Sequence, residues 1–315
     1  MRVRFEAALA VAAMVLAVSS GACDRIATIQ ARRAFKEANA LYQAQDYKGA
    51  AARYEETLKL DPNQTTAYFF LGNSYDNLYK AVRHGEAEND AYLTKAIDNY
   101  KLAADKEQQA AIRKLALQYL VAAYGPDKVN DPVQARPVLE RMIQMDPSEV
   151  SSYFAISKID EDAGDYDRAE ATLLKAKELR PNDANVYMQL AGYYNRLGEF
   201  DKTIDALQQR AAKEPNNPEV YYTIASYYWD KAFRDFRLSD TEKRDYITKG
   251  LDADNQALKI KSDYVEAIVY KGLLLRLQAN VEKDNAKQQA LLKQAEALQE
   301  QAKQLQKKQG AAPGA

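Results

Sequence analysis

The chain has 315 residues, with 44 Lys and Arg against 45 Asp and Glu, so its formal net charge is −1. Such mixed charges form no concentrated basic face, which excludes nucleic acid as an expected partner, and a single cysteine excludes an internal disulfide. Glycine is scarce and no stretch alternates apolar and polar residues as a strand does, so the composition predicts an all-α protein.

The first 22 residues have the pattern of a secretory signal peptide. Arg2 and Arg4 form a basic start, an apolar run follows over residues 7–18, and residues 19–22 are small. The apolar run is too short for a permanent membrane-spanning helix. We therefore expect residues 1–22 to be removed from an exported mature protein.

Cys23, the only cysteine, follows directly. Gly21, Ala22 and Cys23 resemble the lipobox of bacterial lipoproteins, although Ser20 stands where that family usually has leucine. The resemblance implies a lipid on Cys23, which would also remove a free exported thiol. Ordinary cleavage after Ala22 remains an alternative. Residues 23–31 are expected to be the lipidated N-terminus and the start of the first helix, with no flexible linker between them.

A repeat of 34 residues runs through the centre of the chain. Two residue types recur at this interval, namely Pro147, Pro181 and Pro215 and also Tyr153, Tyr187 and Tyr221. Gly164 and Gly198 have the same spacing, and each suits the end of a first helix. This pattern resembles the tetratricopeptide repeat (TPR). It implies a right-handed superhelical solenoid of about seven TPR helical hairpins over residues 32–281, since one hairpin cannot bury its apolar face alone.

Two copies of the repeat, the second and the sixth, are longer than the others. Their second helices return late, at similar stretches over residues 91–98 and 245–252. We expect the extra residues to lengthen the first helix of each, with Tyr79 in one and Phe233 and Phe236 in the other. These aromatic residues either pack within long hairpins or form ridges for a partner, and the sequence leaves both open.

The C-terminal segment, residues 282–309, predicts a long polar helix with one apolar stripe. The stripe consists of Leu291, Ala295, Leu298, Ala302 and Leu305. It is expected to cap the open end of the solenoid, because it is too short for a firm prediction of a coiled coil with another helix. Residues 310–315 are expected to form a disordered tail.

No catalytic or metal-binding pattern occurs in the sequence. His84 is alone in a charged loop, without the partners that a triad or a metal site needs. No glycine-rich phosphate or dinucleotide motif is present. We therefore expect a protein that is not an enzyme, with no catalytic residues, no metal and no cofactor. An enzyme that uses His84 and carboxylates of the irregular copies is the less favoured alternative.

The TPR resemblance implies a concave groove lined by the first helix of each hairpin. The positions that face the groove in this family correspond to Phe35, Asn39, Tyr42, Phe69, Asn73, Asp76, Phe154, Lys158, Met188, Asn195, Tyr222, Ser226 and Trp229. Aromatic and amide side chains of this kind suit an apolar or helical peptide. Phe35 and Phe69 stand where a basic residue would be expected in a TPR that clamps a peptide carboxylate, which argues against that mode. Each of these residues could instead pack against a neighbouring repeat.

These features predict a protein–protein interaction scaffold. The lipobox resemblance implies a location on the periplasmic side of a bacterial envelope, anchored to a membrane by lipid. Other envelope proteins or peptides are the expected partners, and the scaffold is expected to assemble or position a cell-envelope complex. A soluble exported solenoid that binds a small ligand is the alternative.

Overall fold

The structure of the protein is a computed structural model that describes residues 26–310. The predicted signal peptide, Cys23 and residues 311–315 lie outside the described residues. All elements of the described part are helical, and a helix over residues 26–43 comes first. The others are α2 (Tyr47–Leu60), α3 (Thr66–Leu78), η1 (Ala81–Arg83), α4 (Ala87–Lys106), α5 (Ala110–Ala123), α6 (Pro132–Met145), α7 (Ser151–Asp162), α8 (Tyr166–Leu179), α9 (Ala184–Arg196), α10 (Phe200–Lys213), α11 (Pro218–Arg234), α12 (Asp240–Ile260), α13 (Val265–Val281) and α14 (Asn285–Gly310).

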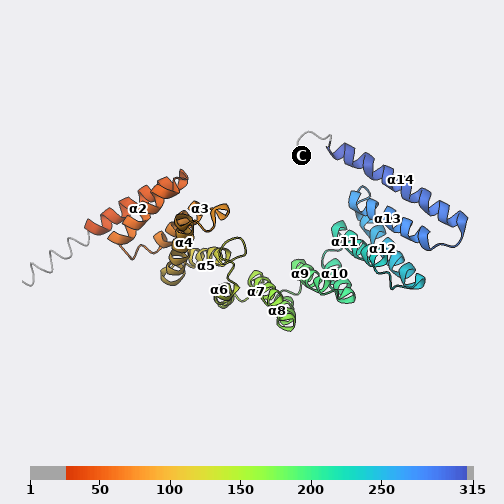
Figure 1. Ribbon diagram of the computed structural model, residues 1–315, viewed down its shortest axis with the longest axis horizontal. Coiled ribbons are helices and arrows are strands. Elements are labelled where there is room, and N and C mark those ends of the chain that lie inside the picture. The colour runs from red at the N-terminus through yellow and green to blue at the C-terminus, as the bar shows by residue number, and fades with distance from the viewer. Residues whose placement is uncertain (1–25, 311–315) are drawn as a thin grey trace, which may run out of the picture. The chain divides into compact units, whose positions relative to one another are not determined.

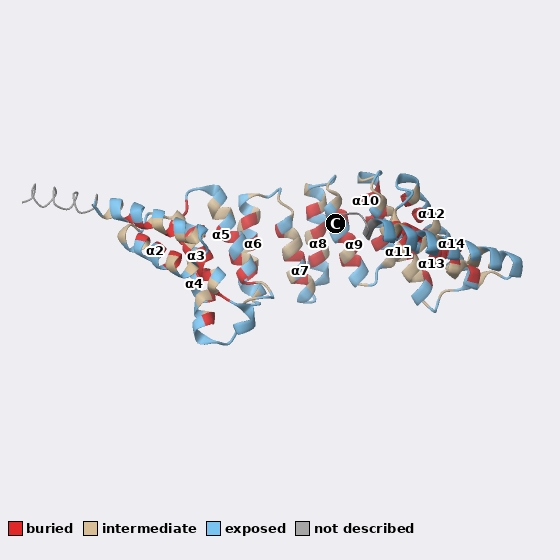
Figure 2. Ribbon diagram, turned by 90° about the horizontal axis from the view of Figure 1, so that it is seen from above, coloured by how far each residue is buried: buried red, intermediate tan, exposed pale blue. Residues whose placement is uncertain are grey.

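The described residues form two compact units that divide between Ile159 and Asp160, and we call residues 26–159 unit 1 and residues 160–310 unit 2. Within each unit, helices that follow one another in sequence pack side by side, for example α3 with α4 and α11 with α12. Buried residues lie along the facing sides of these helices (Figure 2). The predicted all-α architecture of helical hairpins is therefore confirmed for the described residues.

The turns inside regular hairpins depend on glycine. Gly164 and Gly198 follow α7 and α9 with positive φ angles of 78° and 74°. A residue with a Cβ atom adopts this left-handed conformation at a cost, which explains why glycine recurs at this position of the repeat. Ala169 and Ala191 are both buried, and their small side chains allow the helices to approach closely.

The second hairpin differs from its prediction. Its first helix, α3, ends at Leu78, and the extra residues form η1 and a longer second helix, α4. The buried side chain of Asn89 explains this end, because it accepts a hydrogen bond from the N–H of Lys80 (2.8 Å) and donates one to the carbonyl of Lys80 (3.1 Å). These two bonds hold Lys80 in extended backbone against α4. The prediction of a longer first helix is wrong here, whereas in the sixth hairpin α11 and α12 are both long.

The last helix, α14, packs on α13 as the second helix of a seventh hairpin. Ala295 and Ala302 of its apolar stripe are buried, while Leu298 and Leu305 are half-buried. The small side chains of Ala295 and Ala302 let α14 lie close to α13. At Gly272 of α13, the side without a side chain faces the carbonyl oxygen of Ala295 and the Cβ atom of Leu298. None of the helices that the structure describes is long and apolar enough to cross a membrane.

Candidate functional site

In unit 1, the predicted groove residues of the first two hairpins are largely engaged with one another. Phe69 is 7% exposed and Asn73 is 4% exposed. The Oδ1 atom of Asn73 accepts hydrogen bonds from the hydroxyl of Tyr42 (2.5 Å) and from Nδ2 of Asn77 (2.9 Å), while its own Nδ2 donates to the hydroxyl of Tyr100 (3.4 Å). Both lone pairs of the Asn73 oxygen are therefore occupied, one of its two N–H donors is used, and the side chain is buried.

Asn39 is held in a similar way. The hydroxyl of Tyr54, on α2, donates a hydrogen bond to Oδ1 of Asn39 at 2.6 Å. Burial raises the pKa of Tyr54 well above its ordinary value, so this hydroxyl keeps its proton. The ring of Tyr54 also packs edge-on against half-buried Phe35, with their centroids 5.8 Å apart. Asn39 and Phe35 thus contribute to the packing of the first hairpin.

Phe69 and Asp76 join the second hairpin to the third. The ring of Phe69 lies 5.6 Å from that of Tyr119 on α5. The carboxylate of Asp76 accepts a hydrogen bond from the hydroxyl of Tyr100 (3.2 Å) and forms an ion pair with Lys128, in the turn between α5 and α6. Burial, and then the charge of Asp76, raise the pKa of Tyr100. These contacts favour packing over binding for this part of the predicted groove.

The remaining predicted residue pair of unit 1 lies on α7. Phe154 is half-buried and Lys158 is exposed. Both side chains therefore present some surface to solvent, unlike those of Phe69 and Asn73.

In unit 2, three of the predicted residues come together. Asn195 of α9 and Ser226 and Trp229 of α11 line one cavity of about 290 Å³, which we call the concave cavity. The other residues that line it are Tyr227, Asp230, Arg234 and Tyr270. The structure thus brings together side chains from three successive first helices, as the groove prediction requires.

Aromatic contacts hold Trp229 in place. Its ring stacks on Phe233 at 5.0 Å, with an interplanar angle of 10°, and meets the ring of Tyr270 edge-on at 5.6 Å. Tyr270 also packs edge-on against Tyr222, at 5.3 Å. Burial raises the pKa of Tyr222. Trp229 and Tyr222, both predicted from the repeat, therefore share Tyr270 of α13 as a common neighbour.

The polar groups of the concave cavity differ in how far their hydrogen-bonding capacity is already used. In the described part of the chain, the side-chain amide of exposed Asn195 makes no hydrogen bond. The hydroxyl of Ser226 donates to the carbonyl of Thr223 (2.7 Å) and retains its acceptor capacity. Asp230 and Arg234 form an exposed ion pair at 2.5 Å, which adds little net charge.

The sequence prediction missed Tyr227, Asp230, Arg234 and Tyr270. Tyr270 follows Val269, which stands at a groove-facing position of the seventh copy, but Tyr270 itself occupies no such position. It reaches the cavity because α13 packs directly on α11. The only signal in the sequence was that Tyr270 is adjacent to a groove-facing position.

The aromatic residues of the two long hairpins have different environments. Tyr79, in the second hairpin, is 7% exposed, which agrees with packing. In the sixth hairpin, Phe233 is 59% exposed and Phe236 is 89% exposed. Packing therefore accounts for the aromatic residue of the second hairpin, whereas Phe233 and Phe236 of the sixth present apolar surface to solvent.

His84, in unit 1, has one acidic neighbour. Its Nδ1 atom is 3.5 Å from Oδ1 of Asp90, and its side chain is largely exposed. Among residues 26–310, no group of three or more His, Cys, Asp or Glu residues is arranged to hold a metal ion. The geometry around His84 gives no support to the enzyme alternative.

Comparison with known protein families supports the repeat that the sequence predicts. A tetratricopeptide repeat model matches residues 128–193, and a TPR repeat model matches residues 38–78. No curated protein matches the chain.

The chain is similar to several solved structures. The C-terminal part of a TPR repeat-containing protein from Cytophaga hutchinsonii is 15% identical, with a TM-score of 0.57 over 84% of this chain and 95% of that chain. A tetratricopeptide repeat protein from Parabacteroides merdae is 13% identical, with a TM-score of 0.47 over 84% of this chain and 98% of that chain. YrrB, described as a TPR protein with an unusual peptide-binding site, is 19% identical, with a TM-score of 0.41 over 58% of this chain and 85% of that chain.

Stacked repeats of this kind offer extended concave surfaces for binding, which supports a protein-interaction scaffold. The repeat models, the hairpins and their glycine turns lead to the same conclusion, that the chain contains tetratricopeptide repeats.

Proposed function

We propose that this protein is a non-enzymatic adaptor of a bacterial cell envelope, whose concave cavity in unit 2 binds a peptide segment of a partner protein. A lipid on Cys23 holds it on a membrane, and its role is to assemble or position an envelope complex. The observation that carries the peptide-binding part is the concave cavity, where Trp229, Tyr270 and Asn195 meet.

The chemistry of the concave cavity suits a peptide. Trp229 and Tyr270 supply rigid rings that bury large apolar area while losing little conformational entropy. The amide of Asn195 offers both donors and an acceptor, and a peptide backbone presents the complementary groups. The predicted groove amides of unit 1, Asn39 and Asn73, already have internal partners. Unit 2 is therefore the better candidate for recognition.

Charge contributes little to this proposed recognition. Arg234 is paired with Asp230 at the edge of the concave cavity. Exposed ion pairs of this type are weak and are screened by salt. We therefore expect the complex to survive a rise in salt concentration, as an interface based on aromatic contacts would.

Site-specific photo-cross-linking in the source organism tests the proposed site. Met188 of α9 is a predicted groove residue and is 42% exposed, while Leu174 of α8 is outside the predicted set and is 40% exposed. A photo-reactive amino acid at position 188 should cross-link to a partner protein, and the same probe at position 174 should not. Equal cross-linking from both positions, or cross-linking from 174 alone, would contradict the concave site.

Membrane anchoring needs a separate experiment, because Cys23 lies outside the described residues. Cell fractionation of a Cys23→Ala variant should find the protein released from the membrane. Unchanged membrane association of this variant would overturn the lipid anchor and would leave the concave site untouched.

A further inference from the structure

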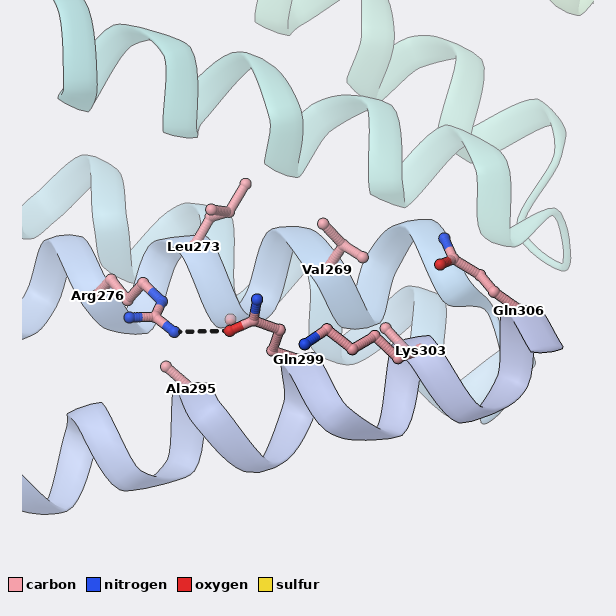
Figure 3. Close-up of a pocket in the computed structure, with 9 residues that line it drawn as sticks. Val269, Leu273, Arg276, Ala295, Gln299, Lys303 and Gln306 are labelled. Atoms are coloured by element: carbon pink, nitrogen blue, oxygen red, sulfur yellow. Dashed lines mark hydrogen bonds between the residues drawn. The ribbon is translucent and has the colours of Figure 1, made fainter.

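A second cavity lies between α13 and α14, the two helices of the seventh hairpin (Figure 3). We call it the terminal cavity. Its volume is about 510 Å³, and its apolar walls include Val269 and Leu273 of α13 and Ala295 and Ala302 of α14. It shares no lining residue with the concave cavity.

Two cations border this apolar space. They are Arg276 of α13 and Lys303 of α14. One guanidinium nitrogen of Arg276 donates a hydrogen bond to Oε1 of Gln299 (3.0 Å), a neutral acceptor, and the other donors of the fork remain available. In the part of the chain that the structure describes, neither Arg276 nor Lys303 forms an ion pair.

No carboxylate lines the terminal cavity. Glu300 lies three residues before Lys303 on the same helix, but it accepts a hydrogen bond from Gln304 instead (3.3 Å). The border of the cavity is therefore positive and lacks a counter-charge from its own walls. An anionic group would supply that charge and would form charge-assisted hydrogen bonds with both cations.

We propose that the terminal cavity binds a small carboxylic acid with an apolar tail. The tail would lie against Val269, Leu273 and the alanines of α14, and the carboxylate would lie between Arg276 and Lys303. A mostly apolar cavity of a few hundred Å³ with a few polar groups at its edge is typical of small-molecule sites. The volume favours a compact ligand over an extended polymer, which would leave the hollow part of the site unfilled.

Octanoate and its neutral analogue octanamide provide a matched pair of probes. Binding of each to the full chain can be measured by saturation-transfer NMR titration at millimolar concentrations. Both probes can accept hydrogen bonds from the two cations, but only the carboxylate of octanoate adds charge attraction to them. We therefore expect octanoate to bind roughly tenfold more tightly than octanamide. Equal affinities would overturn the role of the two cations.

Three variants locate the site. The double variant Arg276→Gln, Lys303→Gln should reduce octanoate binding to the level of octanamide. Lys307→Gln makes the same change of charge on the same helix, outside the cavity, and should leave octanoate binding within twofold of the wild type. Val269→Trp fills the cavity and should abolish binding of both probes.

Circular dichroism tests whether each variant is folded. All variants carry the same N-terminal segment, so nonspecific binding of the apolar probes to that segment is the same in each. Octanoate binding that persists in the double variant or in folded Val269→Trp would place the ligand elsewhere and refute the proposal. Because the two cavities share no residue, these results do not depend on the peptide site.

Discussion

Asp254 of α12 is fully buried, and within the described residues neither of its carboxylate oxygens has a hydrogen-bond partner. Lys271 of α13 is the cation that acts on it, yet the ammonium of Lys271 donates its hydrogen bond to Asn255 instead (2.7 Å). Burial raises the pKa of Asp254 from 3.8 to about 8, and the charge of Lys271 opposes this rise only in part. At neutral pH the folded protein therefore keeps this carboxyl group protonated.

This raised pKa lowers the stability of unit 2 as the pH rises. Below pH 3.8 the group is protonated in both the folded and the unfolded chain, so it has no effect on the free energy of unfolding. Between pH 3.8 and about 8 only the unfolded chain releases the proton, and each pH unit lowers the free energy of unfolding by about 1.4 kcal/mol. At pH 7 the loss amounts to about 4 kcal/mol, and above pH 8 it stays constant.

We expect Asp254→Asn to remove this loss, because an amide has nearly the same shape and does not titrate. The variant should be more stable than the wild type by up to about 4 kcal/mol at pH 7, and by almost nothing at pH 4. Urea unfolding at pH 4, 5, 7 and 8 measures the difference. Fluorescence of Trp229, the only tryptophan, reports on unit 2.

Asp252→Asn is the matched control, since Asp252 is exposed on the same helix. This control should follow the wild type at every pH. The reasoning would be refuted if Asp254→Asn had the same pH dependence as the wild type, or if it were less stable at pH 7.

Three further predictions separate packing from binding. Phe69→Ala should lower the free energy of unfolding of unit 1 by about 3–5 kcal/mol in urea unfolding, because Phe69 is buried; a loss below 1 kcal/mol would contradict its role in the core. Gly72→Ala should cost about 1–3 kcal/mol in the same assay, since its Cβ would lie 2.9 Å from the ring of Tyr100, and unchanged stability would show that the ring can move away. Trp229→Ala should weaken the cross-linked partner's affinity by about 2 kcal/mol, roughly thirtyfold, in a titration of the folded variant; normal affinity would remove Trp229 from the site.

The sequence by itself was sufficient to identify the repeat and its hairpins. Recurring proline, tyrosine and glycine at intervals of 34 residues specify helix ends and helix contacts that are local in sequence, and these depend little on distant parts of the chain. The same locality explains why the regular copies were predicted well. The second hairpin was predicted less well. Its first helix ends because the side chain of Asn89 binds the backbone of Lys80, nine residues earlier, and no helix-ending motif in the sequence indicates this contact.

Only the tertiary structure decided which of the predicted groove residues are available to a partner. Asn39, Asn73 and Asn195 are all predicted to face the groove, yet the first two are hydrogen-bonded to tyrosines of neighbouring helices and Asn195 is not. Such pairings depend on rotamers and on the distance between helices, which no repeat pattern encodes.

The same is true of the cavities and of Asp254. Whether Tyr270 reaches Trp229, or whether a carboxylate on α12 is exposed or buried, depends on how closely the last hairpins pack. Helix periodicity determines which side of a helix faces its neighbour, while burial and the missing hydrogen-bond partners arise only when the neighbouring side chains fill, or fail to fill, the space between the helices.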